Sequence, residues 1–346
     1  MTKNKSALIV AVCDMDLSPG VFYKYDGLSK SGDGILDISF KAYKSRTKFK
    51  YLRMFYDAFG YDQNIVMFRS NLQFSPLLCI IFLILKLKRA RVICEVPTPY
   101  YSHLKTTHSI YGQLCYYFFV PIMFLLCEKI VGYASEGGYL SCFSRKMRLI
   151  GNGISVNGLD LKSNSNVIGD NLNIVGAATI ASWHGWDYVI HAISQIKRTT
   201  GVDVIFHVVG DGPEKKNLTA LAEKLGIMSN VIFYGMQSRD MVQSIYSICQ
   251  LGVGTFNWKQ IAIKEASPLK YREYSAVGLP FLYSTFDPDY DDTDVAFLIG
   301  EDDLVVDLAD KLLKIIRNNN LPTPIMCREY AYKKLDFTKK INDIFL

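Results

Sequence analysis

Short apolar runs rich in β-branched residues alternate with longer segments of helical pattern along most of the chain, and this alternation limits the possible folds more than any other feature. The strand candidates are ALIVAV (7–12), NIVMF (64–68), RVICEV (91–96), NIVGAAT (173–179), DVIFHVVG (203–210), NVIFYG (230–235), QLGVGTF (250–256) and FLYST (281–285). In the second half, helices are predicted between them at about 187–199, 214–226, 239–248 and 265–278. Repeated βα units predict parallel sheets covered by helices on both faces.

A segment rich in glycine, asparagine and serine, 151–171, interrupts the alternation and has the composition of a linker. A chain of 346 residues is also too long for one ordinary core and suits two domains. We therefore predict an α/β protein with two Rossmann-like domains facing a cleft. The predicted parts are a first domain over 1–155, a linker over 156–171, a second domain over 172–325, and a C-terminal helix over 326–346 that packs back towards the first domain.

The cysteines and the N-terminal segment both indicate a reducing compartment. Eight cysteines are scattered without C-x-x-C pairs, which argues against a disulfide framework and against a thiolate zinc site. The first apolar run breaks at Asp14 and is read as a strand, because a signal peptide needs a longer apolar core and a cleavage site. A cytoplasmic location is the prediction.

Charge is distributed unevenly along the chain. Residues 1–150 carry 20 Lys/Arg and 10 Asp/Glu, a net +10, whereas the other 196 residues carry 19 and 23, a net −4. A basic first half fits nucleic acid, an anionic membrane surface or phosphorylated substrates, and it fits a solvated lysine-rich surface equally. Two strongly apolar segments, 75–92 and 111–133, are interpreted as buried or surface-docked helices. The basic residues that follow the first run suggest contact with anionic lipid: Lys86, Lys88, Arg89 and Arg91.

The stretch KEASPLKYREYSAVGLP, 264–280, carries the strongest functional signal. Ser267 and Pro268 predict a helix start, with serine as the N-cap and proline at the first helical position. The free amides of that turn, near Leu269, form an anion site, and Lys270 adds a full charge beside it. A surface helix with a Lys270–Glu273 charge pair explains the same residues without a function.

Two carboxylates flank this helix start. Glu265 is predicted in the loop before the helix, and Glu273 lies six residues after the predicted cap. A nucleotide-sugar needs this arrangement: amides and a cation for the diphosphate, one carboxylate for the ribose and one for the sugar. The acidic run 287–292 lacks the glycine and distal glutamate of a calcium-binding loop, so an acidic surface loop is preferred to a metal site there.

The segment resembles the donor-site signature of family-4-type glycosyltransferases with the GT-B fold. Similar elements follow in the same order: Gly151-Asn152-Gly153-Ile154 resembles the start of that family's second domain, and Val209-Gly210-Asp211-Gly212-Pro213 and Asn230-Val231-Ile232-Phe233-Tyr234-Gly235 resemble its next markers. In the first half, Gly20-Val21-x-x-Lys24 is similar to the family's glycine loop, and Glu95-x-Pro97-Thr98 to an element of one bacterial branch concerned with polysaccharide and glycan assembly.

The resemblance implies roles for individual residues. Glu273 is expected at the ribose, Glu265 at the transferred sugar, and Lys270 at the diphosphate, with Glu265 and Lys270 as the catalytic pair. The other donor-binding candidates are Gly20, His184, Gly210, Gly212, Ser267, Pro268 and Leu269. On the acceptor side the candidates are Glu95 and His103, and no residue is required as a base.

One departure from the family pattern concerns His184-Gly185, which stands where Lys-Gly occurs in many members, without the neighbouring arginine. A neutral imidazole compensates less charge than a lysine, so Lys270 is expected to carry more of the task. A capping or packing role for His184 stays open.

The resemblance implies a retaining, metal-independent, hexosyl-transferring enzyme that uses a UDP- or GDP-linked donor and no cofactor. The acceptor is expected to be a free or lipid-linked saccharide of capsule or exopolysaccharide synthesis, and the enzyme to be peripheral on the inner face of the cell membrane. No nucleic-acid partner is expected. The two alternatives are a nucleotide-sugar epimerase of the same fold and a non-catalytic scaffold of a polysaccharide assembly complex.

Overall fold

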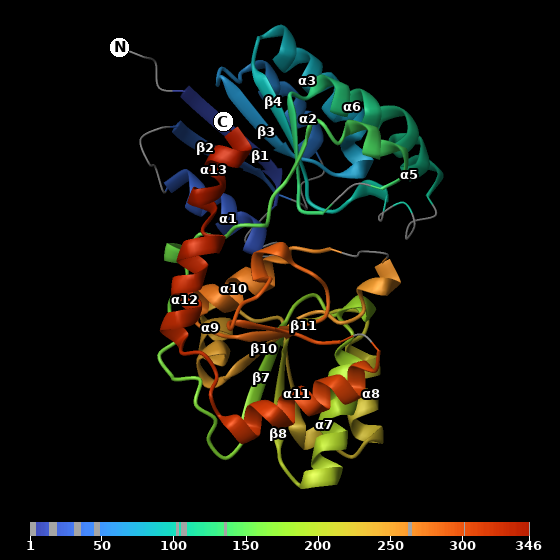
Figure 1. Cartoon of the computed structure of the whole chain (residues 1–346). Helices are drawn as coiled ribbons and strands as arrows, with labels where there is room; N and C mark the ends of the chain where they lie inside the picture. Colours follow the sequence, from blue (N-terminus) through green and yellow to red (C-terminus); the bar gives the residue numbers. More distant parts are fainter. Residues whose placement is uncertain are drawn as a thin grey trace. The chain divides into compact units, whose positions relative to one another are not determined.

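The computed structural model describes residues 5–13, 19–30, 36–44, 49–101, 104, 109–134, 137–261, 265–300 and 302–345. The chain forms two compact units, Met1–Gly158 with Asp336–Leu346, and Leu159–Leu335. Each unit contains one six-stranded parallel sheet with helices packed on it, as the βα alternation predicts (Figure 1).

The first unit has the strand order β2-β1-β3-β4-β5-β6, and all its strand pairs are parallel. The strands are β1 (Lys5–Val12), β2 (Leu36–Tyr43), β3 (Ile65–Arg69), β4 (Arg91–Val96), β5 (Lys129–Gly132) and β6 (Met147–Leu149). The helices are α1 (Pro19–Lys30), α2 (Lys50–Phe59), α3 (Ser75–Leu87), α5 (Ile110–Leu114), a π-helical turn (Cys115–Phe119), α6 (Val120–Leu126) and α13 (Ile341–Phe345).

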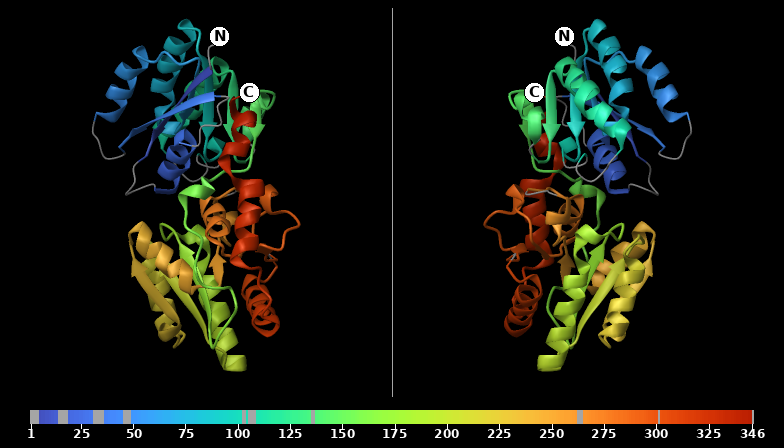
Figure 2. Two further views of the ribbon diagram at one scale, coloured as in Figure 1. Left: turned by 90° about the vertical axis from the view of Figure 1, so that its left-hand side faces the viewer. Right: turned by 90° about the vertical axis from the view of Figure 1, so that its right-hand side faces the viewer.

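The two faces of this sheet are covered by different parts of the chain. Side chains of α2, α3, the π-helical turn and α6 form the core on one face, and those of α1 and the C-terminal segment form the core on the other. Figure 2 shows this unit in two side views, with helices packed on its sheet. Both apolar segments of the sequence, 75–92 and 111–133, therefore supply helices that dock on this sheet.

The second unit has the strand order β12-β11-β10-β7-β8-β9, also fully parallel. The strands are β7 (Leu172–Ala177), β8 (Val204–Val209), β9 (Val231–Gly235), β10 (Leu251–Val253), β11 (Phe281–Tyr283) and β12 (Ala296–Leu298). The helices are α7 (Trp186–Thr200), α8 (Lys215–Lys224), α9 (Arg239–Ile248), α10 (Leu269–Val277), α11 (Leu304–Asn318) and α12 (Pro324–Tyr330). This strand order is that of a doubly wound Rossmann sheet. From β7 the chain first adds β8 and β9 on one side and then β10, β11 and β12 on the other, so the order of strand addition reverses between β7 and β10.

The segment that was predicted as a linker is packed on the second unit over most of its length. Its residues from Leu159 onward belong to the second unit. The Lys162 amide donates to the Val277 carbonyl at 2.9 Å, and the Asn166 amide group donates to the Gly278 carbonyl at 3.0 Å. The glycine-, asparagine- and serine-rich composition therefore reflects irregular backbone that is fixed by hydrogen bonds.

The C-terminal segment 326–346 is not the single helix that we predicted. Its first part, α12 and a π-helical turn at Ala331–Leu335, belongs to the second unit. A 3-10 turn at Phe337–Lys340 and α13 follow and belong to the first unit. Phe337, Ile344 and Phe345 are buried there against the sheet, and the Phe337 amide donates to the Ile154 carbonyl at 2.9 Å.

Candidate functional site

The candidate site lies at the carboxyl ends of β7 and β10, where the strand order of the second sheet reverses. In open parallel sheets a ligand binds at this point, because the loops after the two strands diverge to opposite faces. Here these are the loop 178–185, which leads into α7, and the loop 254–257. Helix α10, which carries most of the predicted donor residues, follows the second of them in sequence.

Gly210 and Gly212 hold the loop after β7 in place. Gly210 has φ +121°, and a Cβ atom there would lie 1.9 Å from the Ala178 carbonyl oxygen. A Cβ atom on Gly212 would lie 2.2 Å from the Ile180 carbonyl oxygen, while the Ile180 amide donates to the Asp211 carbonyl at 2.9 Å. The turn after β8 therefore requires glycine at both positions for close backbone contact with the loop that ends at His184.

His184 is buried and electrically neutral. Its Nδ1 accepts a hydrogen bond from the Ala181 amide at 3.3 Å, so the proton of the neutral ring is on Nε2. Burial, helped by the nearby charge of Lys270, lowers the pKa of His184 to about 2. The imidazole consequently cannot replace the charge of a lysine. The Nε2–H group is the part of the ring that can still donate a hydrogen bond to a ligand.

The loops after β7 and β10 are joined by backbone and indole hydrogen bonds. The Phe256 amide donates to the His184 carbonyl at 2.9 Å, and the Trp186 indole Nε1 donates to the Gly254 carbonyl at 3.0 Å. Gly185, between the acceptor His184 and the donor Trp186, has φ +63° and is the left-handed residue that precedes α7. Sequence reasoning missed Trp186, although a tryptophan directly after a glycine at a predicted helix start is a usable signal for such packing.

Helix α10 begins at Leu269, one residue later than the predicted cap at Ser267 places it and within the range 265–278 that was predicted as helical. Pro268 is its N-cap, in an extended conformation with ψ 137°, and no side chain caps the helix. The predicted capping role of Ser267 is therefore wrong, because Pro268, which has no side-chain acceptor, occupies the cap position and the helix starts only after it. The first amides of α10, at Leu269 and Lys270, have no carbonyl partner within the helix and form the donor end of its dipole.

Glu265 lies before this helix in a half-buried position. Its backbone forms an isolated parallel bridge with Phe286, the position just before Asp287. Residues 262–264, which precede it, lie outside the described residues. The bridge fixes the chain at Glu265, four residues from the first residue of α10.

Lys270 lies between the two loops and the body of the helix. Its Nζ is 5.4 Å from the centre of the Trp186 ring and 3.5 Å from the Thr255 hydroxyl oxygen. Burial lowers the pKa of Lys270 to about 7, against the opposing effect of Glu273. An anion placed at the first amides of α10 restores the full charge of this ammonium group.

Glu273 is half-buried one turn further along α10. Burial raises the pKa of its carboxyl group to about 7, against the opposing effects of Arg239 and Lys270. Arg239 is the first residue of α9, so Glu273 lies near the start of that helix as well. Two ionisable groups with pKa values displaced towards neutrality by burial, three residues apart at a strand-end site, are typical of a functional site.

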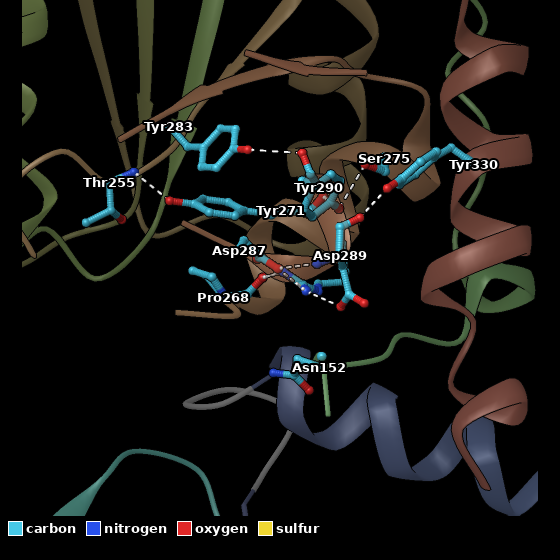
Figure 3. A network of polar contacts seen from close by, with 12 residues as sticks. Asn152, Thr255, Pro268, Tyr271, Ser275, Tyr283, Asp287, Asp289, Tyr290 and Tyr330 are labelled. Atoms are coloured by element: carbon cyan, nitrogen blue, oxygen red, sulfur yellow. Dashed lines mark hydrogen bonds and ion pairs between the residues drawn. The ribbon is translucent and has the colours of Figure 1, made fainter. Parts of the chain in front are cut away.

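A buried ion pair anchors the opposite side of α10. The Arg272 guanidinium is fully buried; it donates to Asp287 through Nη1 and, at 2.8 Å, through Nη2, and it pairs with Asp289 (Figure 3). The Tyr290 hydroxyl donates to the Tyr271 carbonyl at 2.8 Å. Asp287 and Asp289, which sequence reasoning placed in an acidic surface loop, are therefore the partners of Arg272.

No three histidine, cysteine, aspartate or glutamate side chains gather closely enough to hold a metal ion in the part of the chain that the structure describes.

The first-unit candidates have a different environment. Glu95 is fully buried in a network with Lys24, whose Nζ is 3.1 Å from Glu95 Oε1 and 2.8 Å from Asn152 Oδ1. Arg69 Nη1 lies 3.0 Å from the same carboxylate oxygen, and Tyr25 and Tyr133 also donate to the carboxylate. Glu95 is therefore a buried and paired residue of the first unit, and its role on the acceptor side stays a prediction. Lys24 is buried in the same network.

Two further predicted residues lie beside or within segments that the structure does not describe. Gly20 is the second residue of α1, and the loop 14–18 before that helix lies outside the described residues. His103 lies outside them as well. Of the predicted donor residues, the structure brings His184, Lys270 and Glu273 to one edge of the second sheet, supported by Gly210 and Gly212.

Residues 160–334 match the protein family described as "Glycosyl transferases group 1". This range is 175 of the 346 residues and contains the whole site of the second unit. None of the curated proteins matches the chain in sequence.

Solved structures of glycosyltransferases match the fold over 84% to 98% of this chain. The lipopolysaccharide outer core galactosyltransferase WaaB has a TM-score of 0.62 and 13% identity, over 98% of each chain. WaaG, a glycosyltransferase involved in lipopolysaccharide biosynthesis, has a TM-score of 0.59 and 14% identity, over 98% of this chain and 99% of its own. The pneumococcal O-GlcNAc transferase GtfA, solved with UDP and GlcNAc, has a TM-score of 0.59 and 16% identity, over 84% of this chain and 57% of its own.

Proposed function

The chain belongs to the glycosyl transferases of group 1 and has the GT-B fold, and on this premise we propose that it is a retaining enzyme whose donor site is the start of α10. The donor is a nucleotide-sugar, UDP- or GDP-linked. The acceptor is a saccharide or lipid-linked saccharide of surface polysaccharide synthesis. The observation that supports this proposal most is the placement of Lys270 and Glu273, both with a pKa of about 7, beside the first amides of α10.

The proposed donor geometry follows from the helix. The amides of Leu269 and Lys270 receive the diphosphate, and the Lys270 ammonium neutralises it. Glu273, one turn further, accepts hydrogen bonds from the ribose hydroxyls. Glu265 contacts the transferred sugar, and His184 donates from Nε2 to the sugar or the phosphate.

Transfer then depends on stabilising the nucleoside diphosphate as it leaves. As the bond from the anomeric carbon to the phosphate oxygen breaks, negative charge grows on that oxygen. The α10 amides and Lys270 are already oriented towards this charge, which is the arrangement that lowers a barrier by electrostatic preorganisation. We propose that these groups carry out the charge compensation without a metal ion, and that the acceptor oxygen attacks the face from which the diphosphate leaves.

Product analysis distinguishes this proposal from its two alternatives. The purified protein is incubated with UDP- and GDP-sugars, with and without an extract of membrane lipids and saccharides. A transferase yields a glycosylated acceptor. An epimerase yields an isomerised sugar without any acceptor, and a non-catalytic scaffold yields neither product.

The first prediction concerns the charge of Lys270. We expect Lys270→Ala to weaken nucleoside diphosphate binding by about 10- to 100-fold, because a charge-assisted hydrogen bond contributes about 1.5–3 kcal/mol. The free nucleoside, which presents no phosphate, should lose far less affinity. Isothermal calorimetry with both ligands measures the two losses, and Lys224→Ala, at an exposed position of α8, is the matched control. Equal losses for both ligands would show that Lys270 does not contact the phosphates.

The second prediction concerns pH. Nucleoside diphosphate binding needs the protonated, charged form of Lys270, and this form is lost as pH rises above about 7. It also needs the ionised form of Glu273, and that form is lost as pH falls below about 7. Affinity should therefore peak near neutral pH and decline on each side, approaching about tenfold per pH unit for a single linked proton.

Variants separate the two limbs of this profile from the titration of the ligand itself, whose terminal phosphate has a pKa of about 6. In Glu273→Gln, the fall in affinity below neutral pH should shrink to the part that comes from protonation of the terminal phosphate. In Lys270→Met, the fall in affinity above neutral pH should disappear. An affinity that stays constant across neutral pH in the wild-type protein would show that neither group contacts the ligand.

We further propose that the protein works on the inner face of the cell membrane, where a lipid-linked acceptor is presented. No helix among the described residues is long and apolar enough to cross a bilayer. Of the four basic residues at the end of α3 and after it, two have structural contacts: Lys88 donates to the Phe59 carbonyl at 2.8 Å, and Arg91 binds Glu128 at 2.9 Å. Lys86 and Arg89 are exposed and are the ones that we assign to lipid headgroups.

A further inference from the structure

Tyrosine side chains gather where two segments of the first unit meet. One segment is the π-helical turn Cys115–Phe119, which lies between α5 and α6 (Figure 1). The other is a 3-10 turn, Gly138–Phe143, which follows the carboxyl end of β5. Tyr116 and Tyr117 come from the first turn, and Tyr139 comes from the second. A π-helical turn inside an α-helix is rare and frequently marks a functional site.

Tyr116 is the buried base of this cluster. Its ring packs edge-to-face against both of the others, with centroid distances of 5.1 Å to Tyr117 and 5.2 Å to Tyr139. The Tyr139 hydroxyl donates to the Tyr116 carbonyl. Gly138 has φ +64°, and a Cβ atom there would lie 3.1 Å from the Tyr116 hydroxyl oxygen, so the close approach of the two turns favours glycine. The rings of Tyr117 and Tyr139 are therefore held in one arrangement.

Tyr117 and Tyr139 form an exposed aromatic surface on this base. They are 55% and 40% exposed, their ring planes differ by 14°, and their centroids are 5.8 Å apart. No residue in the described part of the chain is hydrogen-bonded to the Tyr117 hydroxyl, which can therefore bond to a ligand. The surface thus combines near-parallel apolar ring faces with hydroxyl groups at their edges.

The chemistry of this surface fits a sugar ring. The C–H groups of a pyranose carry a small positive partial charge and pack on the negative face of an aromatic ring, while its hydroxyl groups bond to polar groups at the rim. No charged residue occurs in 110–126 or in 138–143. A nucleotide or an acidic polymer would find no charged partner on either segment. The surface therefore favours an uncharged saccharide.

We propose that Tyr117 and Tyr139 bind a neutral saccharide chain by stacking against its sugar rings. This site goes beyond the proposed function, because its residues belong to the first unit and the donor-site residues belong to the second. A site of this kind holds a glycan on the protein without the nucleotide-sugar.

Cys142 provides a reporter for this surface. It is exposed, whereas the other seven of the eight cysteines are buried. It lies three residues after Tyr139 in the 3-10 turn, and side chains three residues apart eclipse each other in a 3-10 helix. A saccharide stacked on Tyr139 should therefore shield the Cys142 thiol from a reagent in solution.

The test is the rate at which N-ethylmaleimide alkylates Cys142 in the full chain, with increasing concentrations of neutral hexasaccharides of glucose, galactose or mannose. We expect at least one of them to slow the reaction in a saturable way. Tyr117→Leu keeps a good helix former but removes the ring. It should need at least about tenfold more saccharide for the same protection, because an aromatic side chain buried against a ligand contributes roughly tenfold or more in affinity. Tyr139→Leu should show the same loss, and Tyr117→Phe, which keeps the ring, should be protected nearly as wild type is.

Two controls accompany these variants. Cys142→Ser should abolish the labelling, which identifies the labelled thiol. Tyr56→Leu, at a 64% exposed tyrosine of α2, should be protected as wild type is. The proposal is overturned if no hexasaccharide slows the alkylation of wild type, or if both Tyr117→Leu and Tyr139→Leu are protected as wild type is. Protection by vesicles of phosphatidylglycerol and by no saccharide also overturns it, since the surface would then contact lipid.

Discussion

Replacing Glu273 with alanine is expected to lower the affinity for nucleoside diphosphates at least about a hundredfold while the second unit stays folded. Two charge-assisted hydrogen bonds to the ribose hydroxyls are worth roughly 3 kcal/mol or more. Stability should be unchanged or higher, because burial raises the pKa of this carboxyl group to about 7 and ionising it in the folded protein is unfavourable. Lower affinity without lower stability is the signature of a binding residue.

Calorimetry measures the affinity, and tryptophan fluorescence measures the stability. All three tryptophans, at 183, 186 and 258, lie in the second unit, so their emission follows the unfolding of that unit alone. Glu223→Ala, at an exposed position of α8, is the matched control and should bind as wild type does. Unchanged ligand affinity in folded Glu273→Ala would remove Glu273 from the site.

The largest loss of stability is expected for Arg272→Met. This change leaves the carboxylate of Asp287 fully buried without its cation, and removing one partner of a buried pair costs about 3–5 kcal/mol. Because Arg272 lies between Lys270 and Glu273 on α10, the loss should also weaken nucleoside diphosphate binding. Urea unfolding followed by tryptophan emission gives the free energy of unfolding of the second unit.

The double variant Arg272→Met/Asp287→Leu tests the physical reason. Replacing both buried charges with apolar groups should recover most of the lost stability, since the remaining partner, Asp289, is partly exposed and can be hydrated. Arg317→Met, at an exposed position of α11, controls for the loss of a surface cation. If Arg272→Met were as stable as Arg317→Met, the pair would not anchor the helix.

The regular parts of the fold could be predicted because burial leaves a periodic pattern. Strands such as β4 and β8 are nearly uninterrupted apolar runs, as buried parallel strands should be, and both were predicted. Strand β2 lies at the sheet edge with alternating buried and exposed side chains, and its sequence LDISFKAY is not a continuous apolar run. It was therefore missed, because an edge strand lacks the signal that the others carry.

Parts of the site could be predicted only as residues and not as contacts. Lys270 and Glu273 were identified from their spacing around a helix start. Their buried surroundings depend on Trp186, Thr255 and Arg239, which come from three other segments of the chain. Long-range packing of this kind leaves no local pattern in a sequence.

The sequence could not show which charged residues pair with each other inside the fold. Lys24 and Glu95, 71 positions apart, form one buried pair. Asp287 likewise pairs with Arg272, 15 positions earlier. A charged residue is predicted to be solvent-exposed unless a partner for it is known, because burying an unpaired charge is costly. In both pairs the two residues are too far apart in sequence for the pairing to be recognised.

The central claim is that the start of α10 is the donor site of a sugar-transferring enzyme. Acceptor-dependent release of nucleoside diphosphate tests it most directly. Wild-type protein is given each UDP- or GDP-sugar with and without the membrane extract, beside Glu273→Ala and Glu223→Ala. We predict release with at least one donor only when the extract is present, at equal rates for wild type and Glu223→Ala and strongly reduced for Glu273→Ala. Release that does not depend on the extract, or that Glu273→Ala supports at the wild-type rate with limiting donor, would contradict the account.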